Sequence, residues 1–364
     1  MIFDERERCL ELAGKVLRHY RTALGKDSSL RLLQLSENVT YLVEEKAKSR
    51  AVLRLCRPGY HTPEELRAEM LWMEELGEEF AVWKVSGAVD VKLRQPVSTD
   101  EGSYLCAVED EEGQVYYGTV FTYLPGIPLE ELPAKDQIPW FEKLGEVTAF
   151  LHRQTKNQSD RKCSAVEESD RREQLSRFHW NYESMIGRFA LWGDWRRVIQ
   201  RSGACGIEGC GPKLPESFGT VLERADSLIA DRLRDYGKGK NRYGLIHGDL
   251  RGANLLVDGN TLGIIDFDDC GYGWYMQDLA ASLSFMETEE EVPELIQAWC
   301  RGYRKQGTLE QADMDMTDTF VMMRRLQLLS WINSRSQAAS ARRYRDDFLE
   351  GTVKLANQYI QIRG

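Results

Sequence analysis

The spacing of hydrophobic residues changes several times along the first 80 positions. Residues 4–24 carry apolar side chains three or four positions apart, which predicts an amphipathic helix. The next stretch alternates apolar and polar residues and is rich in Val, Leu and Tyr, which predicts three antiparallel strands, over 30–35, 39–44 and 51–55. Pro63-Glu64-Glu65 then predicts a helix reaching about Leu76, because Pro is favoured in the first turn and acids there complement the helix dipole.

Further alternating stretches predict strands around 81–95, 103–109 and 115–123, before the pattern breaks at Leu124-Pro125-Gly126-Ile127-Pro128. Pro and Gly together interrupt regular structure, so residues 124–128 are expected to link two lobes. Beyond them the pattern is mainly helical, except at 244–269. The sequence therefore predicts an α+β fold with a small antiparallel-sheet lobe over 1–123 and a larger, mainly helical lobe over 129–364.

Composition fits two lobes and restricts the partners. A chain of 364 residues exceeds one hydrophobic core of ordinary size, and 42% hydrophobic with 29% charged residues is typical of a globular protein. The net charge of −10 argues against nucleic acid as a partner, because binding its phosphates needs clustered Lys and Arg. Every apolar run is too short to span a bilayer and the first residues are charged, so we expect a cytoplasmic protein without membrane contact.

Two of the eight cysteines lie close together, Cys205 and Cys210, in a glycine-rich stretch. A zinc site ordinarily needs four ligands, and no second Cys or His pair lies near them in the sequence. Free thiols in a loop are the favoured interpretation, with a disulfide or a partial metal site as the alternative.

The stretch 244–269 carries the candidate chemistry. Two short apolar runs flank Asp258-Gly259-Asn260, and an Asp-Gly turn between apolar runs predicts a β-hairpin. The residue that enters the hairpin then lies beside the residue that leaves it, so Asn254 and Asp266 are expected to meet, with Asp249 one short loop upstream. Carboxylate and amide oxygens suit Mg²⁺, and a further carboxylate nearby can accept the proton of a hydroxyl nucleophile.

The run His247-Gly248-Asp249-Leu250, with Asn254 and then Asp266-Phe267-Asp268, closely resembles the aminoglycoside phosphotransferase and homoserine/choline kinase superfamily, which has a protein-kinase-like fold. The resemblance implies an ATP- and Mg²⁺-dependent kinase with 247–254 as catalytic loop and 266–269 as metal-binding strand end. It makes Asp249 the catalytic base and Asn254 and Asp266 the metal ligands. It also implies that Asp278 braces the catalytic loop.

Other positions depart from the family pattern. Arg251 stands where many small-molecule members have His; it either stabilises the transferring phosphoryl group or pairs with a nearby acid. Arg54 occupies the place of the phosphate-binding Lys, and Glu69 that of its ion-pair partner. The resemblance places the loop that covers the phosphates at residues 35–39. This loop has no glycine, so Ser36 and Asn38 are left to contact the phosphates. A P-loop motif is absent, and adenine is expected at Tyr123 and Leu124.

The short distance along the chain between Asp266 and Asp278 favours a small acceptor, because a protein kinase inserts a long activation segment there. An acceptor pocket is expected among the helices after 128. The aromatic residues over 178–195 are expected mainly in the core, with an aromatic cage for a quaternary amine as the alternative. Two other functions stay open: a bacterial stress-response protein kinase, and a catalytically idle kinase fold. The sequence names neither the acceptor nor the oligomeric state.

Overall fold

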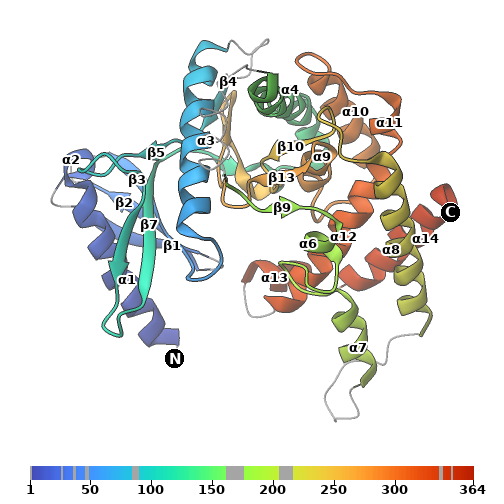
Figure 1. Cartoon of the computed structure of the whole chain (residues 1–364), viewed down its shortest axis with the longest axis horizontal. Helices are drawn as coiled ribbons and strands as arrows, with labels where there is room; N and C mark the ends of the chain where they lie inside the picture. Colours follow the sequence, from blue (N-terminus) through green and yellow to red (C-terminus); the bar gives the residue numbers. More distant parts are fainter. Residues whose placement is uncertain are drawn as a thin grey trace. The chain divides into compact units, whose positions relative to one another are not determined.

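The computed structural model describes residues 2–25, 28–35, 38–45, 49–83, 90–160, 176–204, 216–335, 339–345 and 347–364. It has a mixed α+β fold, with an antiparallel sheet near the N-terminus and a mainly helical remainder, as the sequence predicts (Figure 1). The chain forms two compact units. Unit 1 comprises Met1–Ile127, Lys162–Arg177 and Leu255–Asp268, and unit 2 comprises Pro128–Arg161, Phe178–Asn254 and Asp269–Gly364.

Unit 1 begins with helices and then builds its main sheet in the order β1-β2-β3-β7-β5, with β6 also paired to β7. Its elements are α1 (Ile2–Leu17), the 3₁₀ helix η1 (Arg18–Tyr20), α2 (Arg21–Leu24), β1 (Ser29–Leu35), β2 (Val39–Glu44), β3 (Arg50–Leu55), α3 (Pro63–Val82), β4 (Asp90–Leu93), β5 (Pro96–Val97), β6 (Cys106–Glu109), β7 (Val115–Thr122), β11 (Leu255–Asp258) and β12 (Thr261–Ile264). The short strand β8 (Ile127–Pro128) crosses the boundary, because Ile127 ends the first segment of unit 1 and Pro128 begins unit 2.

The apolar stripe of α1 forms the core of unit 1 with one face of the sheet (Figure 1). Leu12, Ala13 and Val16 are buried against Tyr41 and Leu53, so the helical spacing read from the sequence corresponds to the buried stripe. The three strands predicted over 30–55 are confirmed within a residue or two.

Helix α3 starts at Pro63 as predicted, with Thr62 and Glu65 forming a reciprocal capping box. It continues to Val82 instead of ending near Leu76, and the strand expected around 81–95 is the shorter β4. The apolar residues that suggested a strand at its start therefore belong to the end of this helix.

The predicted hairpin is confirmed as β11 and β12, which pair antiparallel with Leu255 opposite Ile264 and Asp258 opposite Thr261. Strand β12 also pairs in parallel with β4, with Ile264 opposite Leu93. This pairing places the hairpin in unit 1, whereas the sequence analysis assigned all residues after 128 to the helical lobe. The boundary at Ile127 lies inside the expected linker. Motion of two lobes about 124–128 stays a prediction.

Unit 2 is mainly helical but contains a small sheet in the order β10-β13-β9. Its elements are η2 (Leu129–Glu131), α4 (Ala134–Asp160), β9 (His179–Trp180), α6 (Tyr182–Ile186), α7 (Arg196–Ala204), α8 (Glu216–Tyr236), β10 (Tyr243–Ile246), η3 (Gly252–Asn254), β13 (Gly271–Trp274), α9 (Met276–Ser282), α10 (Val292–Tyr303), α11 (Gln311–Met314), α12 (Thr317–Ser334), α13 (Ala339–Tyr344) and α14 (Phe348–Arg363).

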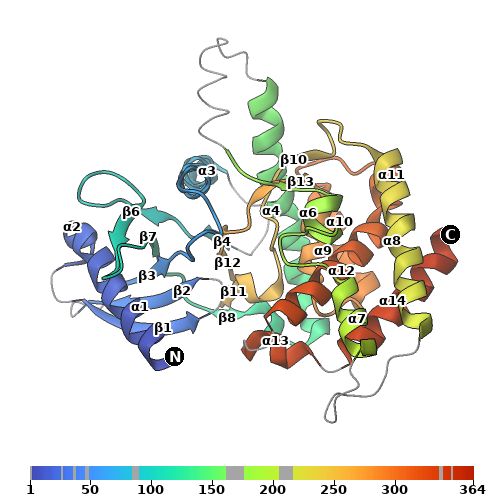
Figure 2. The same cartoon turned by 60° about the horizontal axis from the view of Figure 1, so that its bottom comes forward.

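Helices α4 and α10 pack closely, and α12 is buried along most of its length beside α8 and α14 (Figure 2). Two glycines permit the close contact between α4 and α10. A Cβ at Gly145 would lie 1.9 Å from the carbonyl oxygen of Trp299, and one at Gly302 would lie 1.8 Å from that of Glu142. The two backbones therefore touch where neither helix has a side chain.

Among the residues that the structure describes, no helix is long and apolar enough to cross a membrane. The five cysteines in this part of the chain, Cys9, Cys56, Cys106, Cys270 and Cys300, are buried and not in disulfides. Cys205 and Cys210 lie outside the described residues, so both interpretations of that pair stay predictions.

Candidate active site

The carboxylate of Asp249 lies in unit 2, in the loop between β10 and η3, and three side chains contact it. Asn254 Nδ2 donates to Asp249 Oδ2 at 2.8 Å and to its main-chain carbonyl at 2.9 Å. Arg251 Nε lies 3.4 Å from Oδ2, so Arg251 does pair with an acid, and that acid is the expected base itself. The third contact is a hydrogen bond that Arg324 Nη2 donates to Oδ1.

Arg324 comes from α12, and the sequence analysis did not select it. Its side chain is 3% exposed, Nε donates to Ser284 Oγ at 3.0 Å, and Nη1 donates to Gln327 Oε1 at 3.0 Å. The guanidinium also lies over the Trp192 ring, 5.0 Å from its centroid. Because every nitrogen has a partner, Arg324 holds Asp249 Oδ1 in one direction.

These contacts decide the charge of Asp249. Burial alone would raise the pKa of this carboxyl group, but the positive charges of Arg324 and Arg251 and the neighbouring His247 outweigh burial and lower it. Asp249 is therefore an ionised acceptor at neutral pH, which is the state that a general base requires.

The main chain of the loop is held by Asp278, in the first turn of α9. Gly248 N donates to Asp278 Oδ1 at 2.8 Å and His247 N donates to Oδ2 at 3.1 Å, as the bracing function implied by the resemblance requires. Gly248 has a φ of 81°, and a Cβ there would lie 2.5 Å from the carbonyl oxygen of Asp269. The turn therefore needs glycine next to the candidate base.

The two expected metal ligands belong to different units, Asn254 to unit 2 and Asp266 to unit 1, so their convergence stays a prediction. Each is shaped locally for such a function. Asn254 uses its amide nitrogen on Asp249, which leaves the amide oxygen to face another partner. Asp266 follows β12 with a φ of 66°, a left-handed conformation that is uncommon for a residue other than glycine and occurs often at functional sites.

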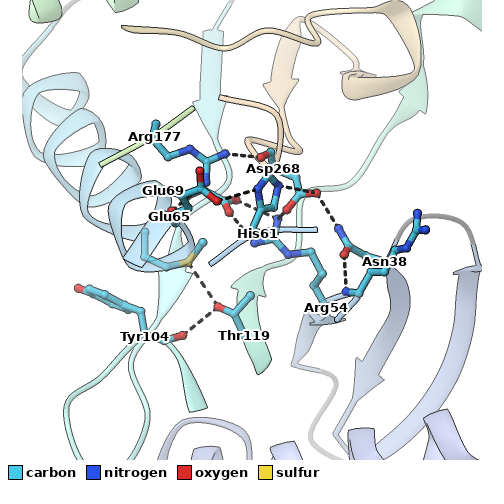
Figure 3. Close-up of polar contacts among 11 residues, drawn as sticks. Asn38, Arg54, His61, Glu65, Glu69, Tyr104, Thr119, Arg177 and Asp268 are labelled. Carbon is cyan, nitrogen blue, oxygen red and sulfur yellow. Dashed lines mark hydrogen bonds and ion pairs between the residues drawn. The ribbon is translucent and has the colours of Figure 1, made fainter. Parts of the chain in front are cut away.

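In unit 1, Arg54 on β3 and Glu69 on α3 form the ion pair that the family pattern implies (Figure 3). Arg54 Nη1 donates to Glu69 Oε1 at 2.9 Å and Nη2 donates to Oε2 at 2.6 Å. Nη1 also lies 3.1 Å from Asp268 Oδ1. Burial alone would lower the pKa of Arg54, but the two carboxylates raise it above its usual value.

Asp268 is the centre of this cluster, two positions after Asp266 (Figure 3). Asn38 Nδ2 donates to its Oδ2 at 2.8 Å, and His61 Nε2 lies 3.6 Å from the same oxygen. His61 Nδ1 lies 3.6 Å from Glu65 Oε2. Arg177 donates to the carbonyl oxygens of Glu65, at 2.8 Å, and of Asp268. Three cations and three carboxylates thus meet in one buried cluster, formed by Arg54, His61, Arg177, Glu65, Glu69 and Asp268.

Charges within the cluster raise the pKa of His61 and lower the pKa of Asp268. Burial opposes protonation of His61, but Asp268 and Glu65 outweigh burial and raise its pKa to about 9. Burial would raise the pKa of Asp268, yet Arg54 and His61 hold it far below its usual value. The cluster therefore contains ionised partners at neutral pH.

The remaining nucleotide contacts expected from the sequence have mixed outcomes. Ser36 lies outside the described residues. The Asn38 side chain is bound within the protein, to Asp268 and to the main-chain N–H of Arg57 at 3.0 Å, so in this structure it is occupied by protein groups. Tyr123 and Leu124 follow β7, and within the described residues their main chain forms no main-chain hydrogen bond. The contact of adenine with these two residues stays a prediction.

The aromatic residues over 178–195 are mainly core, as the favoured interpretation holds. Trp180, Trp192 and Trp195 are buried, whereas Phe189 is exposed. The Trp192 ring faces the guanidinium of Arg324 and, 5.9 Å from its centroid, that of Arg335. Trp192 therefore already contacts two guanidinium groups, and the aromatic cage stays an alternative prediction.

Sequence reasoning missed His61, Arg177 and Arg324, and it named Asp268 only within the expected metal-binding strand end 266–269. Each acts through a partner far along the chain, such as Arg324 and Asp249, which are 75 positions apart. For Asp268 one signal was present, because Asp266-Phe267-Asp268 places it beside an expected metal ligand.

Comparison with known proteins identifies the family of this chain. The model of the phosphotransferase enzyme family (APH) matches residues 30–314. The amicoumacin kinase of Bacillus subtilis is 24% identical over 334 residues, covering 89% of this chain and 84% of that protein. The structure of a microcompartment-associated aminopropanol kinase is similar with a TM-score of 0.77 and 33% identity, covering 98% of both chains.

A second solved structure, of the amicoumacin kinase hAmiN in complex with AMP-PNP, Ca²⁺ and Ami, has a TM-score of 0.64 at 20% identity and covers 94% of this chain and 93% of that one. The family match spans most of the chain, so the protein belongs to the phosphotransferase enzyme family. It is a kinase-like phosphotransferase of the small-molecule type.

Proposed function

We propose that this protein transfers the γ-phosphate of ATP to a hydroxyl group of a small molecule, with Asp249 as the base. The observation that carries the proposal is the Asp249 carboxylate, contacted by Arg324, Arg251 and Asn254 in a chain of this family. Asp249 accepts the proton of the acceptor hydroxyl, whose oxygen forms the new bond to the γ-phosphorus while the bond to the β,γ-bridging oxygen breaks and ADP leaves.

Arg251 has one further task in this scheme. Its Nε faces the base at 3.4 Å, so its guanidinium lies where negative charge passes from the acceptor to the phosphoryl group. Arg324 is a positioning residue, because it touches Asp249 from the buried side and has all its nitrogens occupied.

The two residues expected to bind a divalent cation carry suitable donor atoms. The Asn254 amide oxygen and the Asp266 carboxylate are hard oxygen donors, and Mg²⁺ ordinarily takes one or two protein carboxylates and completes its shell with phosphate and water. In that position it would neutralise charge on the phosphate oxygens. The AMP-PNP and Ca²⁺ bound to hAmiN support a nucleotide and a divalent cation here, and Mg²⁺ is the proposed ion.

A small acceptor is supported by how the chain between Asp266 and Asp278 folds. Gly271–Trp274 forms β13, which pairs with β10, and α9 follows at Met276. This stretch forms a strand and a helix turn, without the long segment on which a protein kinase docks a peptide. The relatives named for amicoumacin and aminopropanol support a hydroxyl compound of the amino-alcohol or aminoglycoside kind, homoserine and choline included.

The test is ADP release from MgATP in the presence of aminopropanol, homoserine, choline, ethanolamine, hydroxylysine, sugars and aminoglycosides, with the Asp249→Asn variant in parallel. We expect one compound class to stimulate ADP release in the wild type and not in the variant. Phosphorus NMR of the product then identifies the phosphate ester. Nucleotide binding without turnover for every compound would contradict the proposal and favour an idle kinase fold or a protein substrate.

A further inference from the structure

The loop that carries the candidate base is connected to both ends of helix α9. Asp278, in the first turn of α9, accepts two main-chain N–H groups of this loop. Ser284 and Phe285 lie in the turn that follows the last residue of α9, and Ser284 Oγ accepts a hydrogen bond from Arg324 Nε at 3.0 Å. Every residue of α9 is buried, so the helix is a fixed support. The turn after α9 therefore takes part in fixing Arg324, which contacts the base.

Phe285, the second residue of this turn, lies beside the other arginine that contacts the base. Arg251 stands between a carboxylate and an aromatic ring. Its Nε lies 3.4 Å from Asp249 Oδ2, and its guanidinium carbon lies over the Phe285 ring, 5.9 Å from the centroid. A guanidinium at this distance is attracted by the negative face of the ring. Two consecutive residues of one turn thus contact the two arginines that converge on Asp249.

The backbone of Phe285 has an unfavourable conformation for its side chain. Its φ is 71°, in the left-handed region, where a bulky residue is uncommon because its Cβ crowds the main chain. Glycine would form the same turn without this cost, so the path of the backbone does not explain why a phenylalanine stands here. Residues in such conformations persist where their surroundings hold them, and they cluster at functional sites.

The surroundings hold the Phe285 ring from three helices. Tyr344 of α13 stacks on it, with ring centroids 3.9 Å apart and an interplanar angle of 11°. Trp331 of α12 and Phe348 of α14 each place a ring centroid 5.9 Å from that of Phe285. The ring is therefore fixed in place although it is only half-buried.

We propose that Phe285 is a positioning residue, whose ring holds the guanidinium of Arg251 against Asp249. Arginine has a long side chain with several rotatable bonds, so a fixed ring that favours one placement of its guanidinium reduces the number of conformations in which Nε leaves the carboxylate. The inference rests on the proposed function, because Phe285 acts there only through Arg251.

The kinetic test uses Phe285→Leu, which keeps most of the apolar volume and removes the ring, and Phe285→Tyr, which keeps the ring. With an acceptor that stimulates ADP release, Phe285→Leu should lower kcat by about 3- to 30-fold, the range of one cation–π contact, with the Kd for ATP unchanged. Phe285→Tyr should restore most of kcat. In an Arg251→Met background, Phe285→Leu should lower kcat by less than about twofold further, because the residue through which it acts is gone.

Phe348→Leu is the matched control. Phe348 belongs to the same aromatic group and also has an arginine over its ring, but that arginine is Arg325, which is paired with Glu287. The control should therefore lose stability in urea unfolding without losing kcat. An equal fall of kcat in Phe348→Leu, or an equal effect of Phe285→Leu with and without Arg251, would overturn the inference, because Phe285 would then only fill space.

A second readout does not depend on turnover. Proton–nitrogen NMR of the arginine Nε–H groups, with Arg251→Met identifying the Arg251 signal, measures how fast this group exchanges with water. Exchange should be about 3- to 30-fold faster in Phe285→Leu than in the wild type and in Phe285→Tyr. Unchanged exchange in Phe285→Leu refutes this inference alone. A wild type that turns over with no acceptor contradicts the proposed function, and the NMR comparison still decides whether Phe285 holds Arg251.

Discussion

Two carboxylates of this protein, Asp249 in unit 2 and Asp268 in unit 1, are both held by arginine, yet their surroundings differ. Around Asp268, the cations Arg54, His61 and Arg177 meet Glu65 and Glu69 as well. Around Asp249, two guanidinium groups converge on a single carboxylate, with an amide from Asn254.

The difference distinguishes a structural cluster around Asp268 from the proposed catalytic group around Asp249. Where positive and negative groups are matched, each satisfies the other and the cluster binds elements of the fold together. Where guanidinium groups outnumber the carboxylate that they contact, an incoming negative charge is favoured, as the phosphoryl group requires.

The largest expected effect comes from removing the charge of Asp249. Asp249→Asn keeps the size of the side chain but removes the proton acceptor, so kcat should fall by about 10²- to 10⁴-fold, while the Kd for ATP stays within about twofold. Steady-state kinetics and calorimetry measure the two quantities. Asp258→Asn, an exposed acid in the hairpin turn, is the control. A comparable loss of ATP affinity would show that Asp249 is not primarily a base.

Breaking the matched cluster should reduce stability more than any other single change described here. Arg54→Met leaves Glu69 and Asp268 facing each other without their shared cation, which should lower the free energy of unfolding by about 3 kcal/mol in urea titrations. Arg67→Met, on helix α3, is the control. It removes an exposed ion pair with Glu64, and the free energy of unfolding should change by less than about 0.5 kcal/mol. If both variants lost the same stability, the cluster would not be the structural element inferred here.

The Arg324→Met variant tests whether the arginine that contacts Asp249 supports catalysis. Without the hydrogen bond to Oδ1, the Asp249 carboxylate loses its fixed direction, so Arg324→Met should lower kcat by about 100-fold with ATP affinity unchanged. Arg335→Met provides the control, because Arg335 also lies over the Trp192 ring. Equal effects of the two variants would indicate that packing on Trp192, and not orientation of the base, is what matters.

The smallest expected effect concerns pH. His61 faces Asp268, Glu65 and Arg177, and its folded pKa of about 9 exceeds the unfolded value of about 6.5. Its contribution to stability is therefore complete below pH 6.5 and is lost as pH rises towards 9. Between pH 6 and pH 8 the wild type should lose about 2 kcal/mol more than His61→Gln in urea unfolding. Parallel pH profiles for the two proteins would show that His61 is not charged in the fold.

Much of the fold followed from local patterns. Short-range patterns predicted the amphipathic stripe of α1, the alternation of β1 to β3 and the capped start of α3. Each of these features depends on residues that are only a few positions apart. The hairpin followed from one Asp-Gly turn. The end of α3 was missed because its last turn is apolar and resembles a strand. The parallel partner of β12 was missed because parallel pairing leaves no signal in either strand alone.

For the site, the sequence by itself indicated the proposed catalytic loop, because residues between His247 and Asn254 are close along the chain and contact one another. The family resemblance also identified Arg54 and Glu69 as partners, and the structure pairs them. Only the tertiary structure decided what surrounds them. Arg324 reaches Asp249 across 75 positions, and Asn38 reaches Asp268 across 230. Such contacts depend on how whole helices and strands pack, and no periodicity or spacing in the sequence encodes that packing.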